Sequence, residues 1–185
     1  MKRKLIVISG ASATGKTTLG VRLQKDLGVP LIAKDDIKEM LFDTLPQSDR
    51  KWSKMQGRMA IAMMFAGARV LLDHGEPVAI ESVFDREKAR EDIEALSGDG
   101  DVDTMEVHCY VSEPVRQHRW RHRVSVSRHA GHLDGAVAPV DVATSRPIYP
   151  DRAISIDTGA EAEIYESSCK GLIEHLSAWL KEGTE

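Results

Sequence analysis

The residues from Gly10 to Thr17 carry the clearest chemical signal in the sequence. They match the pattern GxxxxGK(S/T), in which glycines let backbone N–H groups turn inward around a phosphate. Lys16 can reach the outer phosphates of a nucleotide, and the Thr17 hydroxyl can bind Mg²⁺. The pattern predicts a P-loop that binds ATP with Mg²⁺. We expect the contacts to come from Gly10, Ala11, Ser12, Ala13, Thr14, Gly15, Lys16, Thr17 and Thr18.

The surroundings of this loop strengthen the prediction. An apolar run, Leu5 to Ile8, precedes it and is typical of a strand covered on both faces. A helical pattern follows and ends at Gly28, so the loop joins a buried strand to a helix. A glycine-rich turn that matches by chance would lack this context. The GxGxxG pattern of dinucleotide-binding loops is absent.

Carboxylates follow two further apolar runs. Asp35 and Asp36 come directly after residues 31–33, and Glu81 comes after residues 77–80. The carboxyl ends of parallel strands meet at one edge of a sheet, where ligands bind. A carboxylate beside the P-loop could therefore accept the proton of a hydroxyl group that attacks the terminal phosphate. Either aspartate could instead cap the helix that follows it.

A basic segment lies between Pro114 and His132, with five arginines and no carboxylate. Arg119 and Arg123 are four residues apart and would share one face of a helix, which suits the binding of an anion. His118 and His122 have the spacing of helical metal ligands, but no Cys, Asp or Glu completes a set, so we do not expect zinc. The arginines of this segment are Arg116, Arg119, Arg121, Arg123 and Arg128.

Strands and helices alternate along the chain. The expected strands are 5–8, 31–33, 77–80, 105–111 and 153–156, and the expected helices are 17–27, 35–45, 49–74, 89–97, 113–126 and one that contains 165–179. Parallel neighbours need crossover connections, so five such repeats predict a parallel sheet with helices on both faces. We therefore expect one α/β domain over residues 1–185, with the three-layer P-loop NTPase fold and a lid at about residues 113–150.

The long helix over residues 49–74 shows a stripe of large apolar side chains. We interpret this stripe as core packing and not as a site for a cofactor. Its members are Trp52, Met55, Met59, Met63, Ala66 and Val70.

Composition narrows the class of protein further. The chain has 185 residues, of which 42% are hydrophobic and 29% charged, and its net charge is −4. This charge gives no reason to expect a polynucleotide partner. No apolar stretch approaches the length of a membrane span, and Cys109 and Cys169 form neither a metal-binding pair nor a disulfide framework. We expect a cytoplasmic protein that does not bind a membrane.

The chain resembles a family of small P-loop kinases and phosphotransferases that includes polynucleotide 5′-kinase, zeta-toxin-like kinases and chloramphenicol phosphotransferase. The resemblance extends from Leu5 to about Gly159. Its pieces are the P-loop, the strand end Lys34-Asp35-Asp36-Ile37-Lys38, the strand over residues 78–84, the arginine-bearing helix and the strand end over residues 154–158.

The resemblance implies a role for several of these residues. Asp35 would be the general base, which leaves Asp36 to cap the following helix. Glu81 aligns with an acidic position of the relatives and could hold Mg²⁺ together with Thr17, or orient the acceptor. Arg119 and Arg123 match lid arginines that neutralise the phosphates during transfer, so the expected catalytic residues are Asp35, Lys16, Arg119 and Arg123.

One departure concerns the acceptor. The family often has Asp-x-Arg where this chain has Lys38, which is a cation without the two-pronged geometry of arginine. This weakens the case for a phosphorylated acceptor such as a nucleic acid end. Relatives of unknown substrate carry a run similar to residues 128–134, which we expect in a mobile lid that reaches the acceptor. The expected acceptor contacts are Asp35, Lys38, Glu81, Arg128 and His132.

These features predict an ATP-dependent kinase that phosphorylates a hydroxyl group of a small molecule. A polynucleotide 5′-hydroxyl kinase is an alternative, although the negative net charge and the aromatic content of 5% oppose it. A nucleotide-dependent switch or an ATPase without an acceptor is another, which Asp35 and the arginines oppose. The sequence identifies neither the acceptor nor the oligomeric state.

Overall fold

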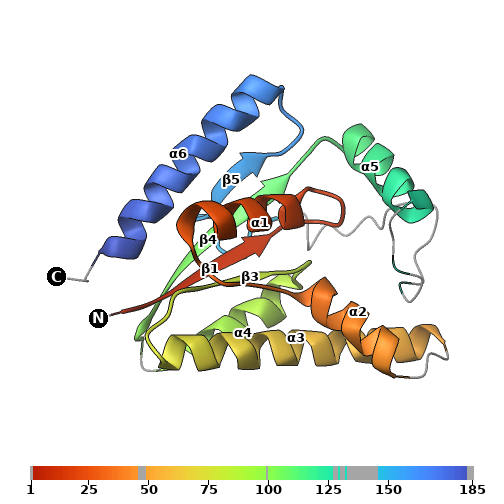
Figure 1. Ribbon diagram of the computed structural model, residues 1–185, viewed down its shortest axis with the longest axis horizontal. Coiled ribbons are helices and arrows are strands. Elements are labelled where there is room, and N and C mark those ends of the chain that lie inside the picture. Colours follow the sequence, from red (N-terminus) through yellow and green to blue (C-terminus); the bar gives the residue numbers. More distant parts are fainter. Residues whose placement is uncertain are drawn as a thin grey trace.

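The computed structural model describes residues 2–45, 49–98, 100–126, 129, 132 and 146–182. Its strands are β1 (Arg3–Ser9), β2 (Leu31–Ala33), β3 (Val78–Glu81), β4 (Val102–Tyr110) and β5 (Ile154–Asp157). Its helices are α1 (Lys16–Leu27), α2 (Lys34–Thr44), α3 (Arg50–Asp73), α4 (Arg86–Ser97), α5 (Glu113–Val126) and α6 (Ala162–Lys181). The strands pair in parallel in the order β2-β3-β1-β4-β5 (Figure 1).

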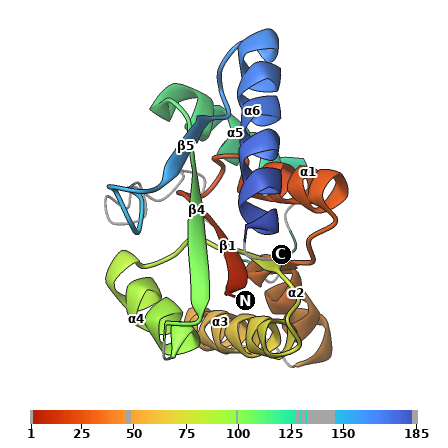
Figure 2. The same ribbon diagram turned by 90° about the vertical axis from the view of Figure 1, so that its left-hand side faces the viewer.

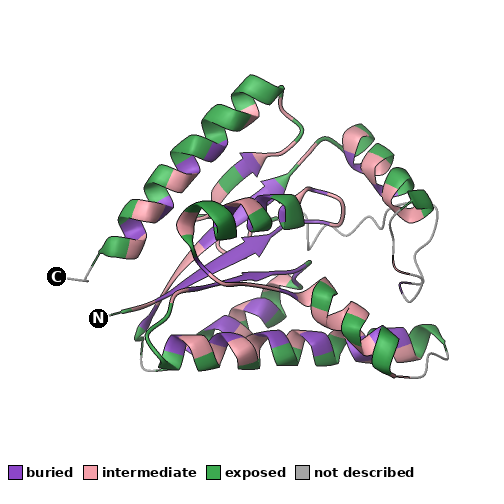
Figure 3. Ribbon diagram, in the orientation of Figure 1, coloured by how far each residue is buried: buried purple, intermediate pink, exposed green. Residues whose placement is uncertain are grey.

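The central strand β1 separates two hydrophobic cores. Its side chains alternate between faces, so Leu5 and Val7 pack against α3 and α4, whereas Ile6 and Ile8 pack against α1 and α6. Figure 2 shows the sheet between these two layers, and Figure 3 shows that β1 is buried along almost its whole length. Each fully buried aliphatic side chain of this kind contributes roughly 1.5–3 kcal/mol to folding. The predicted three-layer α/β fold is confirmed.

Two details of the prediction are wrong. Strand β4 begins at Val102 and not at residue 105, because its first residues pair with the start of β1, and Lys4 Nζ lies 2.9 Å from Asp103 Oδ2. The apolar stripe on α3 is not the core face, since Met59, Met63 and Val70 are exposed. The buried side of α3 consists of Ser53, Gln56, Ala60, Met64, Ala68 and Leu72. Helix α3 has apolar residues on two sides, so the positions of large apolar residues alone do not identify the side that packs against the core.

The order of the strands determines the edge of the sheet at which a ligand can bind. The strands β2 and β3 lie on one side of β1, and β4 and β5 lie on the other, so the strand order reverses at β1 and a crevice opens beyond its carboxyl end. Ser9, Ala33, Glu81 and Tyr110 end four strands at this edge. In the described part of the chain, we find no helix with the length and apolar character needed to cross a membrane.

Candidate active site

The loop between β1 and α1 adopts a conformation that requires its glycines. Gly10 and Gly15 have positive φ angles of 132° and 82°. A Cβ atom at Gly10 would lie 2.2 Å from the carbonyl oxygen of Cys109, so only glycine fits there. Ala13 also has a positive φ, of 65°, which is uncommon for a residue with a side chain. The loop thus curls back over the end of β1 and points its backbone toward the start of α1.

Lys16 and Thr17 meet Glu81 at the start of α1. Lys16 is buried, and its Nζ donates to the carbonyl oxygen of Ala11 at 2.9 Å and lies 3.8 Å from Glu81 Oε1. Thr17 Oγ1 donates to Glu81 Oε2 at 2.9 Å. Burial lowers the pKa of Lys16, and the nearby Glu81 carboxylate opposes this shift. Burial likewise raises the pKa of Glu81, against the opposing effects of Lys16 and the Thr17 hydrogen bond.

Helix α2 places carboxylates opposite the P-loop. The helix begins at Lys34, so Asp35 and Asp36 both lie in its first turn, and the residue at the N-cap is Ala33. The prediction that Asp36 caps this helix is therefore wrong, because a cap at Asp36 requires the helix to begin at Ile37 and it begins three residues earlier. Lys34 Nζ lies 2.8 Å from Asp35 Oδ1. Partial burial, and then the neighbouring Asp35, raise the pKa of Asp36.

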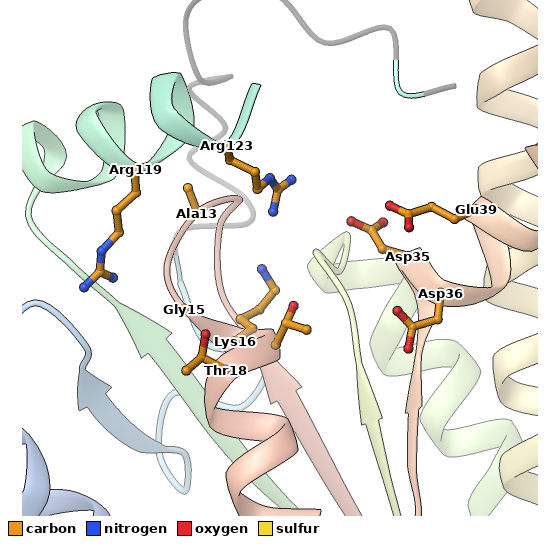
Figure 4. Close-up of a pocket in the computed structure, with 10 residues that line it drawn as sticks. Ala13, Gly15, Lys16, Thr18, Asp35, Asp36, Glu39, Arg119 and Arg123 are labelled. Carbon is orange, nitrogen blue, oxygen red and sulfur yellow. The ribbon is translucent and has the colours of Figure 1, made fainter. Parts of the chain in front are cut away.

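A pocket of about 330 Å³ opens between the P-loop, α2 and α5. Figure 4 shows Asp35, Asp36 and Glu39 on one side of it, across from Lys16. Its lining residues are Ala13, Gly15, Lys16, Thr17, Thr18, Asp35, Asp36, Glu39, Arg119 and Arg123. Glu81 and Ser12 line a smaller cavity that also touches Lys16 and Asp35. The chain therefore brings a P-loop lysine, arginines and strand-end carboxylates around one space.

The arginines of α5 occupy different places. Both Arg119 and Arg123 line the pocket, but Arg123 reaches toward the space between the P-loop and α2, whereas Arg119 lies on the other side of the loop (Figure 4). Arg119 donates from Nη1 to Thr158 Oγ1 at 2.9 Å and from Nη2 to the Thr158 carbonyl oxygen at 2.6 Å. Arg116 is buried and forms an ion pair with Glu113 at 2.7 Å. Arg121 is exposed to solvent.

Two residues expected at the acceptor, Lys38 and His132, do not line this pocket. The ammonium group of Lys38 lies 5.0 Å from the centre of the Phe42 ring, next to the backbone of Gly57 on α3. His132 has only 2% of its side chain exposed, and its Nε2 lies 3.0 Å from Glu39 Oε1. Arg128 lies outside the described residues, as does most of the expected lid.

The oxygen atoms near Lys16 suit a hard cation. Thr17 and Glu81 place a hydroxyl and a carboxylate side by side at the P-loop, and Mg²⁺ prefers such oxygen ligands together with those of a phosphate. Elsewhere in the described ranges, no three histidines, cysteines or carboxylates lie close enough together to hold a metal ion. These two residues are therefore the ones that fit Mg²⁺ bound with a nucleotide.

The sequence did not predict that Glu39 and Thr158 belong to the site. Glu39 lies one helical turn after Asp35 and lines the pocket, which follows from the spacing once the helix is known to begin at Lys34. Thr158, in the turn after β5, donates from Oγ1 to the carbonyl oxygen of Thr14 at 2.7 Å. Its only signal in the sequence is its place after a strand, because β5 is distant from the P-loop along the chain.

Comparisons with known proteins identify relatives of this fold. The sequence profile of a family described as AAA domain matches residues 5–138. A candidate kinase from Chloroflexus aurantiacus is 26% identical and superposes with a TM-score of 0.80, over 96% of this chain and 98% of that chain. A search among curated proteins found no match.

Two further solved structures share the fold at lower identity. The APS kinase of Mycobacterium tuberculosis, solved in complex with AMPPNP and APS, is 20% identical with a TM-score of 0.64, over 95% of this chain and 98% of that chain. A gluconokinase from Sinorhizobium meliloti is 19% identical with a TM-score of 0.59, over 99% of this chain and 98% of that chain. The fold is therefore that of small P-loop kinases.

Proposed function

The chain belongs to the AAA domain family, and from this premise we propose that it is an ATP-dependent kinase that phosphorylates a hydroxyl group of a small molecule. The observation that carries the proposal is the pocket in which the P-loop residue Lys16 faces the strand-end carboxylate Asp35. In an ATPase without an acceptor, a carboxylate at that position would take up the proton of water instead. A kinase needs one to take up the proton of its acceptor.

The P-loop side of the pocket would hold the triphosphate. Its backbone N–H groups and the amino end of α1 favour an anion, and Lys16 would exchange its bond to the Ala11 carbonyl oxygen for one to the outer phosphates. Thr17 and Glu81 would hold Mg²⁺, which neutralises phosphate charge when it is bound. Burial disfavours the charged forms of both Lys16 and Glu81. This supports the assignment, because the phosphates would compensate the charge of Lys16 and Mg²⁺ would compensate that of Glu81.

The transfer step follows from the two sides of the pocket. Asp35 would accept the proton of the acceptor hydroxyl as its oxygen forms a bond to the γ-phosphorus. The bond between that phosphorus and the β–γ bridging oxygen breaks, and ADP leaves with the electron pair. Arg123 lines the same pocket and would stabilise the charge on the transferred group. We assign Arg119 to the nucleotide side, since its contacts hold the turn after β5 against the P-loop.

The relatives support the proposal at the level of class. The solved neighbours include an APS kinase and a gluconokinase, whose names state that they act on APS and on gluconate, both of which are small molecules. An enzyme that uses ATP and keeps Cys109 and Cys169 as buried free thiols would work in the cytoplasm. Polynucleotide 5′-kinase activity is the second candidate, and the carboxylates of α2 disfavour it because they would repel a phosphate backbone.

A transfer screen tests the proposal. The protein would be incubated with Mg-ATP labelled in its γ-phosphate and with metabolites, nucleosides, aminoglycosides or oligonucleotides, and the label would be followed by chromatography. We expect labelled product from at least one small hydroxyl compound with the wild type, and none with Lys16→Ala prepared in parallel. Label on oligonucleotides alone would replace the proposal with the second candidate. Free labelled phosphate with no organic product from any acceptor would mean an ATPase.

A further inference from the structure

One side of helix α3 exposes apolar side chains to solvent. Met59, Met63 and Val70 are 39%, 48% and 57% exposed, and Ala62 and Ala66 between them are exposed as well. These five residues, called the outer stripe below, recur every three or four positions and therefore lie on one side of the helix over about three turns. The opposite side of α3 packs on the sheet, and the helix forms an outer edge of the molecule (Figure 1). Scattered apolar side chains are ordinary on a surface, but a contiguous stripe marks a place where a partner binds.

The outer stripe is complementary to itself. The pairs Met59 with Val70, and Met63 with Ala66, share one midpoint along the helix. If two α3 helices pack antiparallel about that midpoint, Met59 of each copy faces Val70 of the other, and Met63 faces Ala66. Each long, flexible methionine thus meets a smaller side chain, and the alanines allow the helix axes to approach to about 8–10 Å.

The charges beside the outer stripe suit the same pairing. Arg58 precedes the stripe, and Asp73 and Glu76 follow it. Among the residues that the structure describes, none forms an ion pair with Arg58 or Glu76, and the side chain of Asp73, which pairs with Arg3, is still 48% exposed. In the antiparallel pair, Arg58 of each copy lies beside the acidic end of the other, and twofold symmetry forms both contacts at once. A parallel pair would instead bring Arg58 against Arg58.

We infer that α3 is the interface of a homodimer, in which the outer stripes of two copies pack antiparallel across a twofold axis. A second copy fits this surface better than a lipid membrane does. The outer stripe has none of the Trp, Phe and Leu side chains typical of helices that lie in a membrane surface, and anionic headgroups would repel Asp73 and Glu76. No residue of the stripe lines the nucleotide pocket, so each copy keeps its own site.

Sedimentation velocity of the wild type over a series of concentrations tests the inference. The dimer would have twice the 20.5 kDa mass of the chain. We expect a dissociation constant on the order of 10 μM, because one pair of helices buries less area than a standard interface of about 1,600 Å². A protein that is monomeric up to about 200 μM would overturn the inference, since the paired stripes would then bind too weakly to associate.

Met63→Glu connects the dimer to the outer stripe, and Val21→Glu is its matched control. Val21 is 54% exposed on α1, which covers the other face of the sheet. Met63→Glu would bury two carboxylates in the interface and should raise the dissociation constant at least about 30-fold, whereas Val21→Glu should leave it unchanged. Both variants should keep the circular dichroism spectrum and the Mg-AMPPNP affinity of the wild type. A dimer that persists in Met63→Glu, or that is lost equally in Val21→Glu, would overturn the inference.

A charge exchange tests the antiparallel direction. Arg58→Glu would place like charges together at both ends of the interface, so the dissociation constant should rise about tenfold. Adding Glu76→Lys to the same chain restores opposite charges at each end and should recover several-fold of the lost affinity. A double variant that associates no more tightly than Arg58→Glu alone would overturn the antiparallel arrangement.

Further outcomes separate the inference from other occupants and from the proposed function. A monomeric wild type that sediments with phosphatidylserine vesicles, and loses this binding in Met63→Glu, would assign the outer stripe to a membrane surface and overturn the inference. Phosphoryl transfer by a monomeric protein would also overturn it and would leave the proposed kinase standing. A dimer that responds to Met63→Glu as expected would uphold the inference even if the same samples failed to bind Mg-AMPPNP.

Discussion

Two adjacent aspartates at the end of β2 differ in their surroundings, and this difference assigns their roles. Asp35 touches both cavities of the site and lies 2.8 Å from the Lys34 ammonium group, whereas partial burial and the neighbouring Asp35 raise the pKa of Asp36. A group that must accept a proton near neutral pH has to be ionised beforehand. These observations support Asp35 as the base and Asp36 as a contact for the acceptor.

Substitution of each aspartate should separate these roles. Asp35→Asn removes the proton acceptor, so kcat for phosphoryl transfer should fall by about 100-fold or more, with unchanged affinity for Mg-AMPPNP. Asp36→Asn should raise KM for the acceptor and leave kcat near that of the wild type. Steady-state kinetics with an acceptor identified in the screen would measure both. The reverse pattern would make Asp36 the base.

At the scale of elements, the turn after β5 holds three parts of the site together. Thr158 Oγ1 donates to the Thr14 carbonyl oxygen in the P-loop and accepts from Arg119 on α5. A Cβ atom at Gly15 would lie 3.1 Å from the same oxygen, which shows how closely the turn packs on the loop. The position of α5, and with it that of Arg123, therefore depends on a residue of the last strand connection.

Thr158→Val tests this dependence, because valine keeps the shape and removes the hydroxyl group. The loss of two partly buried hydrogen bonds should lower the free energy of unfolding by about 1–3 kcal/mol and weaken binding of Mg-AMPPNP several-fold. Urea denaturation and titration calorimetry would measure the two effects. Thr158→Ser, which retains the hydroxyl, should behave like the wild type. Equal stability and affinity in the valine variant would show that the turn does not position the loop.

The local elements of the site could be predicted, and their long-range partners could not. Gly10 to Thr17 form one contiguous motif, and Asp35 follows a strand whose parallel neighbours fix the edge at which it lies. Glu39 was missed because its place depends on the first residue of α2, and Thr158 because no local pattern indicates that β5 approaches the P-loop. The stripe of Met59 and Met63 led to the wrong face of α3, since size and apolar character were similar on two sides.

For the molecule as a whole, one buried carboxylate connects distant parts of the chain. Glu106, on β4, is 1% exposed and accepts hydrogen bonds from Ser9 Oγ and from the backbone N–H groups of Ile148 and Tyr149, the latter two at 2.9 and 2.8 Å. Ser9 directly precedes the P-loop, and residues 148–149 precede β5. Glu106 therefore joins the base of the nucleotide loop to the chain that returns to the sheet.

Glu106→Ala should cost more stability than a typical core substitution of its size. It leaves two backbone N–H groups and a hydroxyl without their acceptor, so the free energy of unfolding should fall by about 2–4 kcal/mol. Glu106→Gln, which still offers one acceptor oxygen, should lose less. Glu91→Ala on the exposed side of α4 should match the wild type in the same urea titrations. A loss no larger than that of Glu91→Ala would show that the return segment is held by other contacts.

Every role proposed for the site requires a bound nucleotide, and titration calorimetry with Mg-AMPPNP tests this binding directly. The loop of residues 10–17 should bind one nucleotide per chain with a Kd below about 1 mM. Lys16→Ala removes the charged partner of the outer phosphates, so its Kd should be about 10- to 100-fold higher while its fold, followed by circular dichroism, is unchanged. Absence of binding by the wild type at millimolar nucleotide, or equal binding by both proteins, would contradict the account.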